Sequence, residues 1–74
     1  MQYFKIEITY PNGEIEEVDE DFFHLNKAIE SANHLLGQVS YNAQFHEGGN
    51  DVQPYAIVKE YTNDAVKIVY DSRN

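Results

Sequence analysis

The segment LNKAIESANHLL, residues 25–36, gives the clearest structural signal in the chain because its apolar residues recur at helical spacing. At about 100° per residue, these side chains occupy one arc of roughly 120° around a helix axis. The apolar set is Leu25, Ala28, Ile29, Ala32, Leu35 and Leu36. Gly37 follows at the place where a left-handed residue commonly ends a helix. The pattern predicts an amphipathic helix over about residues 24–36 with one buried face.

Strand signals come before this helix. Residues 3–10, YFKIEITY, alternate apolar and polar side chains, which is typical of a half-buried strand. Residues 11–13, Pro-Asn-Gly, have the composition of a hairpin turn. We therefore expect a second strand over about residues 14–18, paired with the first.

The chain after the helix contains further strand signals. Residues 39–46 alternate in hydrophobicity, so they form a third strand or stay irregular. Residues 47–51, EGGND, indicate a connecting loop and lack the lysine and following helix of a phosphate-binding loop. Residues 55–61 and 65–70 read as strands joined by a tight turn at residues 62–64.

These elements predict a single small α+β domain over residues 1–74. One helix must bury its apolar stripe against something, so it packs on one face of an antiparallel sheet as a two-layer sandwich. The expected order is β-β-α-β-β-β, or β-β-α-β-β if residues 39–46 are irregular. The residues expected in the core besides the helix stripe are Phe4, Ile6, Ile8, Ile15, Val18, Val66, Ile68 and Tyr70.

Composition excludes several classes of function. The 74 residues include no cysteine, so disulfides, thiolate zinc sites and thiol nucleophiles are impossible. No apolar run approaches the ~20 residues of a membrane span, and no signal-peptide pattern is present. The formal charge of −8 opposes direct binding to nucleic acid or anionic membranes. We expect a soluble cytoplasmic protein.

The negative charge is concentrated in EIEEVDED, residues 14–21. Ile15 and Val18 both reach the core only if a β-bulge at Glu16-Glu17 absorbs one residue. Asp19, Glu20 and Asp21 precede the helix, where negative charge complements its dipole. A calcium loop is excluded because the glycine and ligand positions do not fit. The alternative is an acidic patch that imitates nucleic-acid phosphates, made of Glu14, Glu16, Glu17, Asp19, Glu20 and Asp21.

The sequence offers no metal or catalytic constellation. His24, His34 and His46 are ten or more residues apart and lack metal-binding spacing. No nucleophile-elbow sequence surrounds a serine. We therefore expect no cofactor and no enzymatic activity, although a small enzyme remains a third hypothesis.

Six tyrosines and four phenylalanines exceed what one helix-covered sheet face needs. Tyr3 falls on the side of its strand away from Phe4 and Ile6. Residues 55–61 are semi-apolar on both faces, so Tyr55, Ile57 and Tyr61 either share the side of Tyr3 or extend the core. RNA-binding sheets surround such rings with basic residues, which are scarce here. The leading hypothesis is a non-catalytic module that binds a protein partner or itself through this surface. The alternative is an acidic inhibitor of a nucleic-acid enzyme, similar in logic to phage or plasmid proteins.

Overall fold

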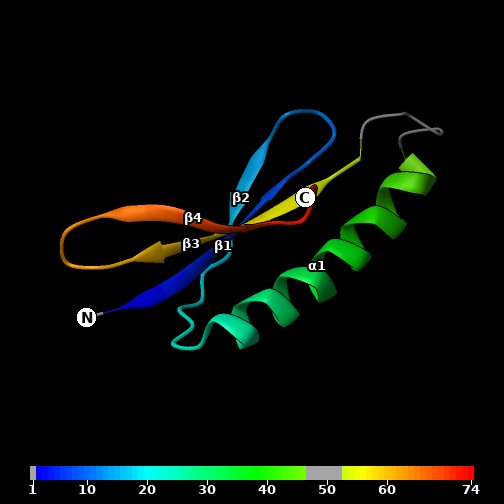
Figure 1. The fold of residues 1–74 in the computed structure, drawn as a ribbon. Helices are drawn as coiled ribbons and strands as arrows, with labels where there is room; N and C mark the ends of the chain where they lie inside the picture. The colour runs from blue at the N-terminus through cyan, green and yellow to red at the C-terminus, as the bar shows by residue number, and fades with distance from the viewer. Residues whose placement is uncertain (1, 47–52) are drawn as a thin grey trace.

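The computed structural model describes residues 2–46 and 53–74 and contains one helix packed on a four-stranded antiparallel sheet (Figure 1). The predicted loop at residues 47–51 lies outside the described residues. The elements are β1 (Tyr3–Thr9), β2 (Ile15–Glu17), α1 (Leu25–His46), β3 (Tyr55–Tyr61) and β4 (Val66–Asp71). The order is therefore β-β-α-β-β, the second of the two predicted orders.

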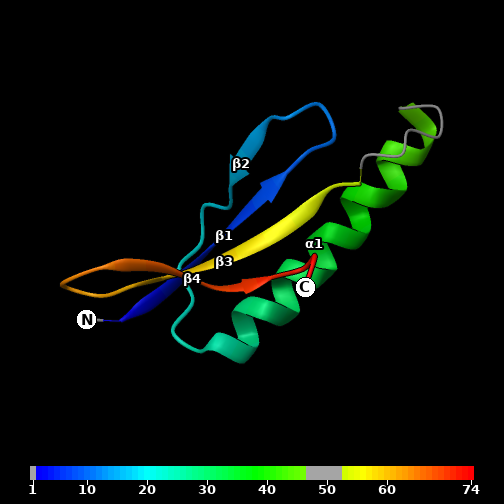
Figure 2. The same cartoon turned by 45° about the horizontal axis from the view of Figure 1, so that its top comes forward.

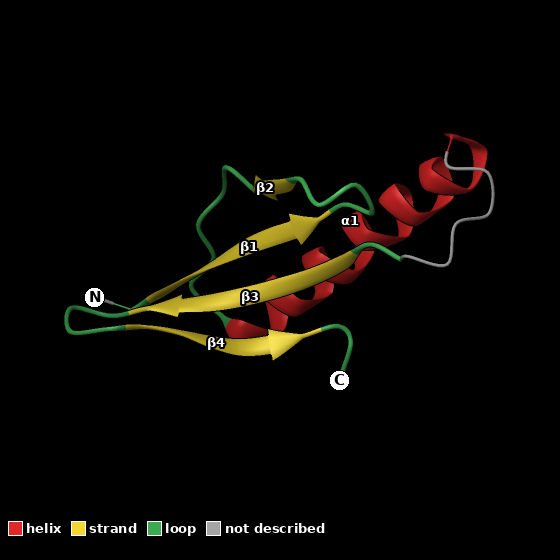
Figure 3. Cartoon of the chain, turned by 90° about the horizontal axis from the view of Figure 1, so that it is seen from above, coloured by secondary structure: helices red, strands yellow, loops and turns green. Residues whose placement is uncertain are grey.

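The strands lie in the order β2-β1-β3-β4, so β1 and β3 are central (Figure 3). All three pairings are antiparallel. α1 runs behind β1 and β3, and its C-terminal part continues past the ends of these two strands (Figures 2 and 3). The opposite face of the sheet, which we call the outer face, is not covered by the helix. Among the described residues, no helix is both long and apolar enough to cross a membrane.

The core lies between α1 and the two central strands. The alternation of β1 buries every second side chain, as predicted, and β3 contributes two more. Two alanines of α1 are fully buried, and their small size lets the helix approach the sheet closely. The buried set is Phe4, Ile6, Ile8, Ala28, Ala32, Ala56 and Val58. The larger residues of the helix stripe pack around this core, partly buried.

The predicted end of the helix at Gly37 is wrong, as is the possible strand at residues 39–46. α1 continues through both to His46. Among the described residues only Gly13 has a positive φ, so Gly37 lies in helical backbone and is no left-handed cap. Val39 and Ala43 are four residues apart, a spacing that fits both a strand of period two and a helix of period 3.6. The alternation was therefore ambiguous, and the glycine only weakens the helix locally.

Three residues predicted for the core lie on the outer face instead. Ile15 pairs with Thr9 and is 64% exposed. Val66 and Ile68 pair with Tyr61 and Lys59, which also face outward, and are 55% and 58% exposed. Residues directly opposite each other in antiparallel strands share a face, so these pairings fix the orientation of all three.

The predicted bulge at Glu16-Glu17 is also wrong. Residues 15–17 pair with β1 without interruption. The register shift falls between β3 and β4, where Val58 faces Tyr70 and Lys59 faces Ile68. One extra residue, Val69, thus reverses the alternation of β4. Tyr70 consequently packs against the core, as predicted, while Ile68 does not.

Candidate functional site

The outer face of the sheet carries a stack of two tyrosines. Tyr3 and Tyr61 are opposite each other in the β1–β3 ladder. Their ring centroids are 5.1 Å apart and the rings are inclined by 5°. Val66 is the β4 partner of Tyr61, so it extends this aromatic pair toward the edge of the sheet. The result is an apolar platform near the turn between β3 and β4.

The structure places all four residues of the predicted contact surface on the outer face. Ile57 lies between Tyr55 and Lys59 along β3 and is half-buried. Tyr55 is at the opposite end of β3 from Tyr61, beneath the guanidinium of Arg73, whose central carbon is 3.8 Å from the ring centroid. The face is therefore a band along the whole of β3 rather than a single cluster. Sequence reasoning missed Val66 and Ile68 as members because it assigned them to the core.

Ion pairs neutralise the basic residues on this face. Lys59 Nζ donates a hydrogen bond to Glu7 Oε2 at 2.6 Å, and Lys5 Nζ lies 2.9 Å from Asp21 Oδ1. These carboxylate partners, by hydrogen bonding, raise the pKa of Lys59 and of Lys5 above the usual value for lysine. The central part of the outer face thus combines apolar side chains with charges that are already paired.

A third pair lies at the C-terminal end of the face. Two guanidinium nitrogens and the backbone N–H of Arg73 donate hydrogen bonds to the Asp71 carboxylate, the shortest at 2.7 Å. These hydrogen bonds lower the pKa of Asp71 from 3.8 to about 2. With Lys67–Glu60, at 3.5 Å on the β3–β4 hairpin, four of the five basic residues make ion pairs.

The six carboxylates of residues 14–21 are all exposed. Glu17 faces outward opposite Glu7, whereas Glu16 is opposite Ile8 and accepts a hydrogen bond from the Tyr10 hydroxyl at 2.5 Å. That hydrogen bond raises the pKa of Tyr10 above the usual value. The acidic residues therefore project from both faces of the β2 edge rather than converging on one point.

The acidic residues Asp19, Glu20 and Asp21 precede α1, as expected, and one of them has an ion-pair partner on β1. The first turn of α1 contains no acidic residue, and Asp21 pairs with Lys5 on β1. Backbone hydrogen bonds join Val18 to Ile6 and Phe22 to Phe4, so residues 19–21 are looped out between two attachment points on β1. This loop brings the Asp21 carboxylate to Lys5 on the outer face.

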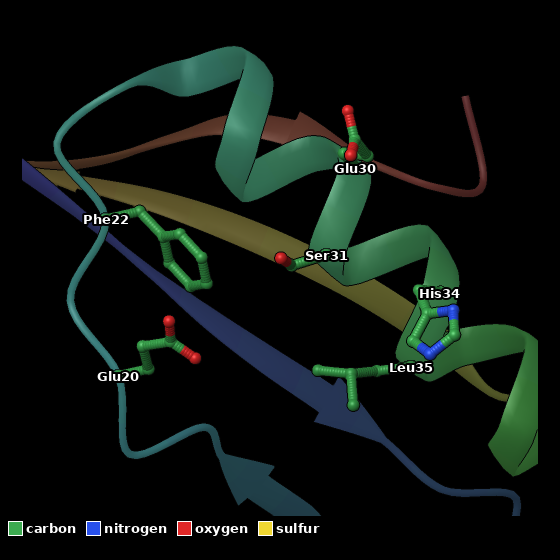
Figure 4. Close-up of a pocket in the computed structure, with 6 residues that line it drawn as sticks. All are labelled: Glu20, Phe22, Glu30, Ser31, His34 and Leu35. Atoms are coloured by element: carbon green, nitrogen blue, oxygen red, sulfur yellow. The ribbon is translucent and has the colours of Figure 1, made fainter.

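A groove lies along α1, bounded on its other side by the segment that precedes the helix (Figure 4) and, farther along, by β1 and β2. One hollow of about 400 Å³ is lined by Glu20, Phe22, Glu30, Ser31, His34 and Leu35. A second, of about 420 Å³, is lined by Ile8, Tyr10, Glu16, Glu17, Val18, Asp19, Leu35 and Gln38. Leu35 lines both, so the two hollows adjoin. This groove could not be predicted from the sequence, because it depends on how residues 18–24 cross from β2 to the helix.

The histidines are dispersed. His24 precedes α1, and its carbonyl accepts the hydrogen bond of the Ala28 N–H. His34 is exposed on α1, with its Nε2 atom 3.4 Å from the side-chain nitrogen of Gln38. His46 is the last residue of the helix. Within residues 2–46 and 53–74, no group of three or more histidine, aspartate or glutamate side chains is placed to hold a metal ion.

Comparison of the chain with protein families, with curated proteins and with solved structures finds no match.

Proposed function

We propose that this protein is a non-catalytic module that binds another protein through the outer face of its sheet. The observation that carries the proposal is the Tyr3–Tyr61 stack, continued by exposed Val66 and Ile68 on a face that α1 does not cover. Tyrosine is enriched at protein interfaces because a rigid ring provides a large contact area with a polar tip.

The paired charges define the chemistry of the partner. Lys5 and Lys59 already have carboxylate partners on the outer face. A strongly charged partner would have to compete with these pairs, whereas an apolar, uncharged surface leaves them intact. We therefore assign an apolar, uncharged protein surface as the partner of this face.

The test compares Tyr3→Ala and Tyr61→Ala with Phe23→Ala. Phe23 is 59% exposed but precedes α1, outside the sheet, so its truncation is a matched control. The immobilised full chain would be exposed to extract of its native host, and captured proteins quantified by mass spectrometry. Truncation of a central interface tyrosine costs about 1–4 kcal/mol, so capture should fall roughly fivefold or more.

Capture that is unchanged by both tyrosine variants would refute the proposal. Circular dichroism spectra of all three variants must match that of the unmodified protein, which separates lost binding from lost folding. Light scattering would show whether the partner is a second copy, since the mass would then double and return to that of the monomer in Tyr61→Ala.

A second function, an acidic inhibitor of a nucleic-acid enzyme, is favoured by one specific observation. Most basic residues are paired on the sheet, while the carboxylates of residues 14–21 are exposed at its β2 edge. Such a surface would occupy a basic nucleic-acid groove. Binding should then weaken steeply with salt and with glutamine or asparagine at the six acidic positions; binding that is insensitive to salt contradicts this function.

A further inference from the structure

We propose that the groove between α1 and residues 18–24 binds a basic peptide segment of a partner protein, with a lysine or arginine side chain in the hollow between Glu20 and Glu30. This site is separate from the outer face and does not depend on it. The proposal rests on the shape of the groove, on its apolar floor and on the sign of the charge along both walls.

The groove is elongated and runs along one side of the helix. Its two adjoining hollows are each about 400 Å³ in volume and share Leu35. Figure 4 shows Phe22 and Leu35 extending toward the space between the helix and the incoming segment. An extended peptide therefore has two successive hollows in which to place side chains, over a floor of aromatic and aliphatic carbon.

The walls of the groove are negative on both sides. Glu20 comes from the segment before the helix and Glu30 from the helix itself, and the second hollow adds Glu16 and Asp19. No lysine or arginine lines either hollow, and four of the five bases are paired elsewhere. Charge complementarity therefore selects a cationic occupant.

Long basic side chains best fit a groove that combines an apolar floor with acidic walls. Lysine and arginine lay their methylene stems along apolar surface while the charged head group stays near solvent and carboxylates. A guanidinium presents five donors, which suits carboxylates on two opposing walls. A bare metal ion does not suit the groove, because the described residues contain no converging group of three ligands. Nucleic acid is repelled by the same carboxylates.

The test uses a synthetic probe, an acetylated and amidated nonapeptide of alternating arginine and leucine. Its titration into isotopically labelled full-length protein would be followed by amide chemical shifts. The expected result is shifts at Phe22, Ser31 and Leu35, with Tyr3 and Tyr61 unaffected. The same peptide with glutamine in place of arginine should not bind. Shifts on the outer face alone, or equal binding of the glutamine peptide, would overturn the proposal.

Matched charge variants distinguish peptide binding in the groove from non-specific attraction of the peptide to the net negative charge of the protein. Glu20→Gln with Glu30→Gln should weaken binding roughly tenfold, since both wall contacts are lost. Glu14→Gln with Asp64→Asn removes the same charge from two exposed turn positions and should change the dissociation constant less than about twofold. Equal weakening in both double variants would overturn the proposal.

Two further variants distinguish this site from the outer face. Ser31→Gln adds bulk within the first hollow without changing its charge and should reduce binding, while circular dichroism confirms that the helix is retained. Tyr3→Ala should bind the probe as the unmodified protein does. Failure of the peptide to bind would leave the outer-face proposal standing, and a failed outer face would leave this one standing.

Discussion

Replacing Gly37 with alanine tests the largest difference between the fold predicted from the sequence and the observed one. A left-handed cap at this position would make alanine destabilising, because its Cβ clashes at positive φ. In the structure Gly37 lies within α1, twelve residues from its start and nine from its end. Alanine there should stabilise the protein.

The expected magnitude follows from the surroundings of Gly37. A Cβ built on this residue meets nothing within 4 Å outside the helix backbone, so no steric cost offsets the gain. Alanine in a helix interior is favoured over glycine by about 0.5–1 kcal/mol, mainly because the unfolded chain has less freedom to lose. For a domain of this size that difference raises the melting temperature by about 2–8 °C.

Gly13→Ala is the matched control, since it makes the same chemical change in the opposite backbone environment. Gly13 has φ of 92° in the turn between β1 and β2. An L-residue in left-handed backbone is disfavoured by about 1–2 kcal/mol, so this variant should lose stability. Urea unfolding followed by far-ultraviolet circular dichroism measures both free energies of unfolding. If Gly37→Ala loses stability as Gly13→Ala does, α1 ends at residue 36 and the assignment of residues 37–46 is refuted.

Three further predictions concern the core and the outer face. Ile6→Val should cost about 0.5–1.5 kcal/mol because Ile6 is fully buried, whereas Ile15→Val, at 64% exposure, should cost less than about 0.5 kcal/mol by urea unfolding. Ala32→Leu should cost about 1–3 kcal/mol by the same measurement, because Ala32 is fully buried between helix and sheet; a neutral result would show that this interface is loosely packed. The pKa of Asp71 is depressed to about 2, so its contribution to stability is complete above pH 3.8 and is lost as the pH falls through 2. Arg73→Gln should return this pKa toward 3.8 in a carboxyl carbon-13 titration; an unchanged value would show that Arg73 is not its cause.

The candidate surfaces were only partly accessible to sequence reasoning. Alternation along β1 set Tyr3 apart from the core, and alternation along β3 grouped Tyr55, Ile57 and Tyr61, since side-chain direction along a strand follows from local geometry. The register between the two strands placed all four on one face. Ile68 could not be placed, because one bulged residue in β4 reverses its direction. The groove beside Leu35 could not be predicted from the sequence. It forms between a helix and a segment whose path is set by two backbone attachment points on β1.

The amino-acid pattern established the types of the main elements and most of the core, and left open whether residues 39–46 add a further strand. Periodicity carried this information, because the 3.6-residue repeat of α1 and the two-residue repeat of β1 each mark a buried face. The end of α1, the direction in which β2 and β4 turn their apolar residues, and the ion-pair partner of each carboxylate emerged only in the folded chain. The strand orientations and the ion pair depend on a partner in another element: Asp21 pairs with Lys5, Val66 follows Tyr61, and Ile15 follows Thr9. Pairing across the sheet, rather than local propensity, set the two surfaces from which function is proposed.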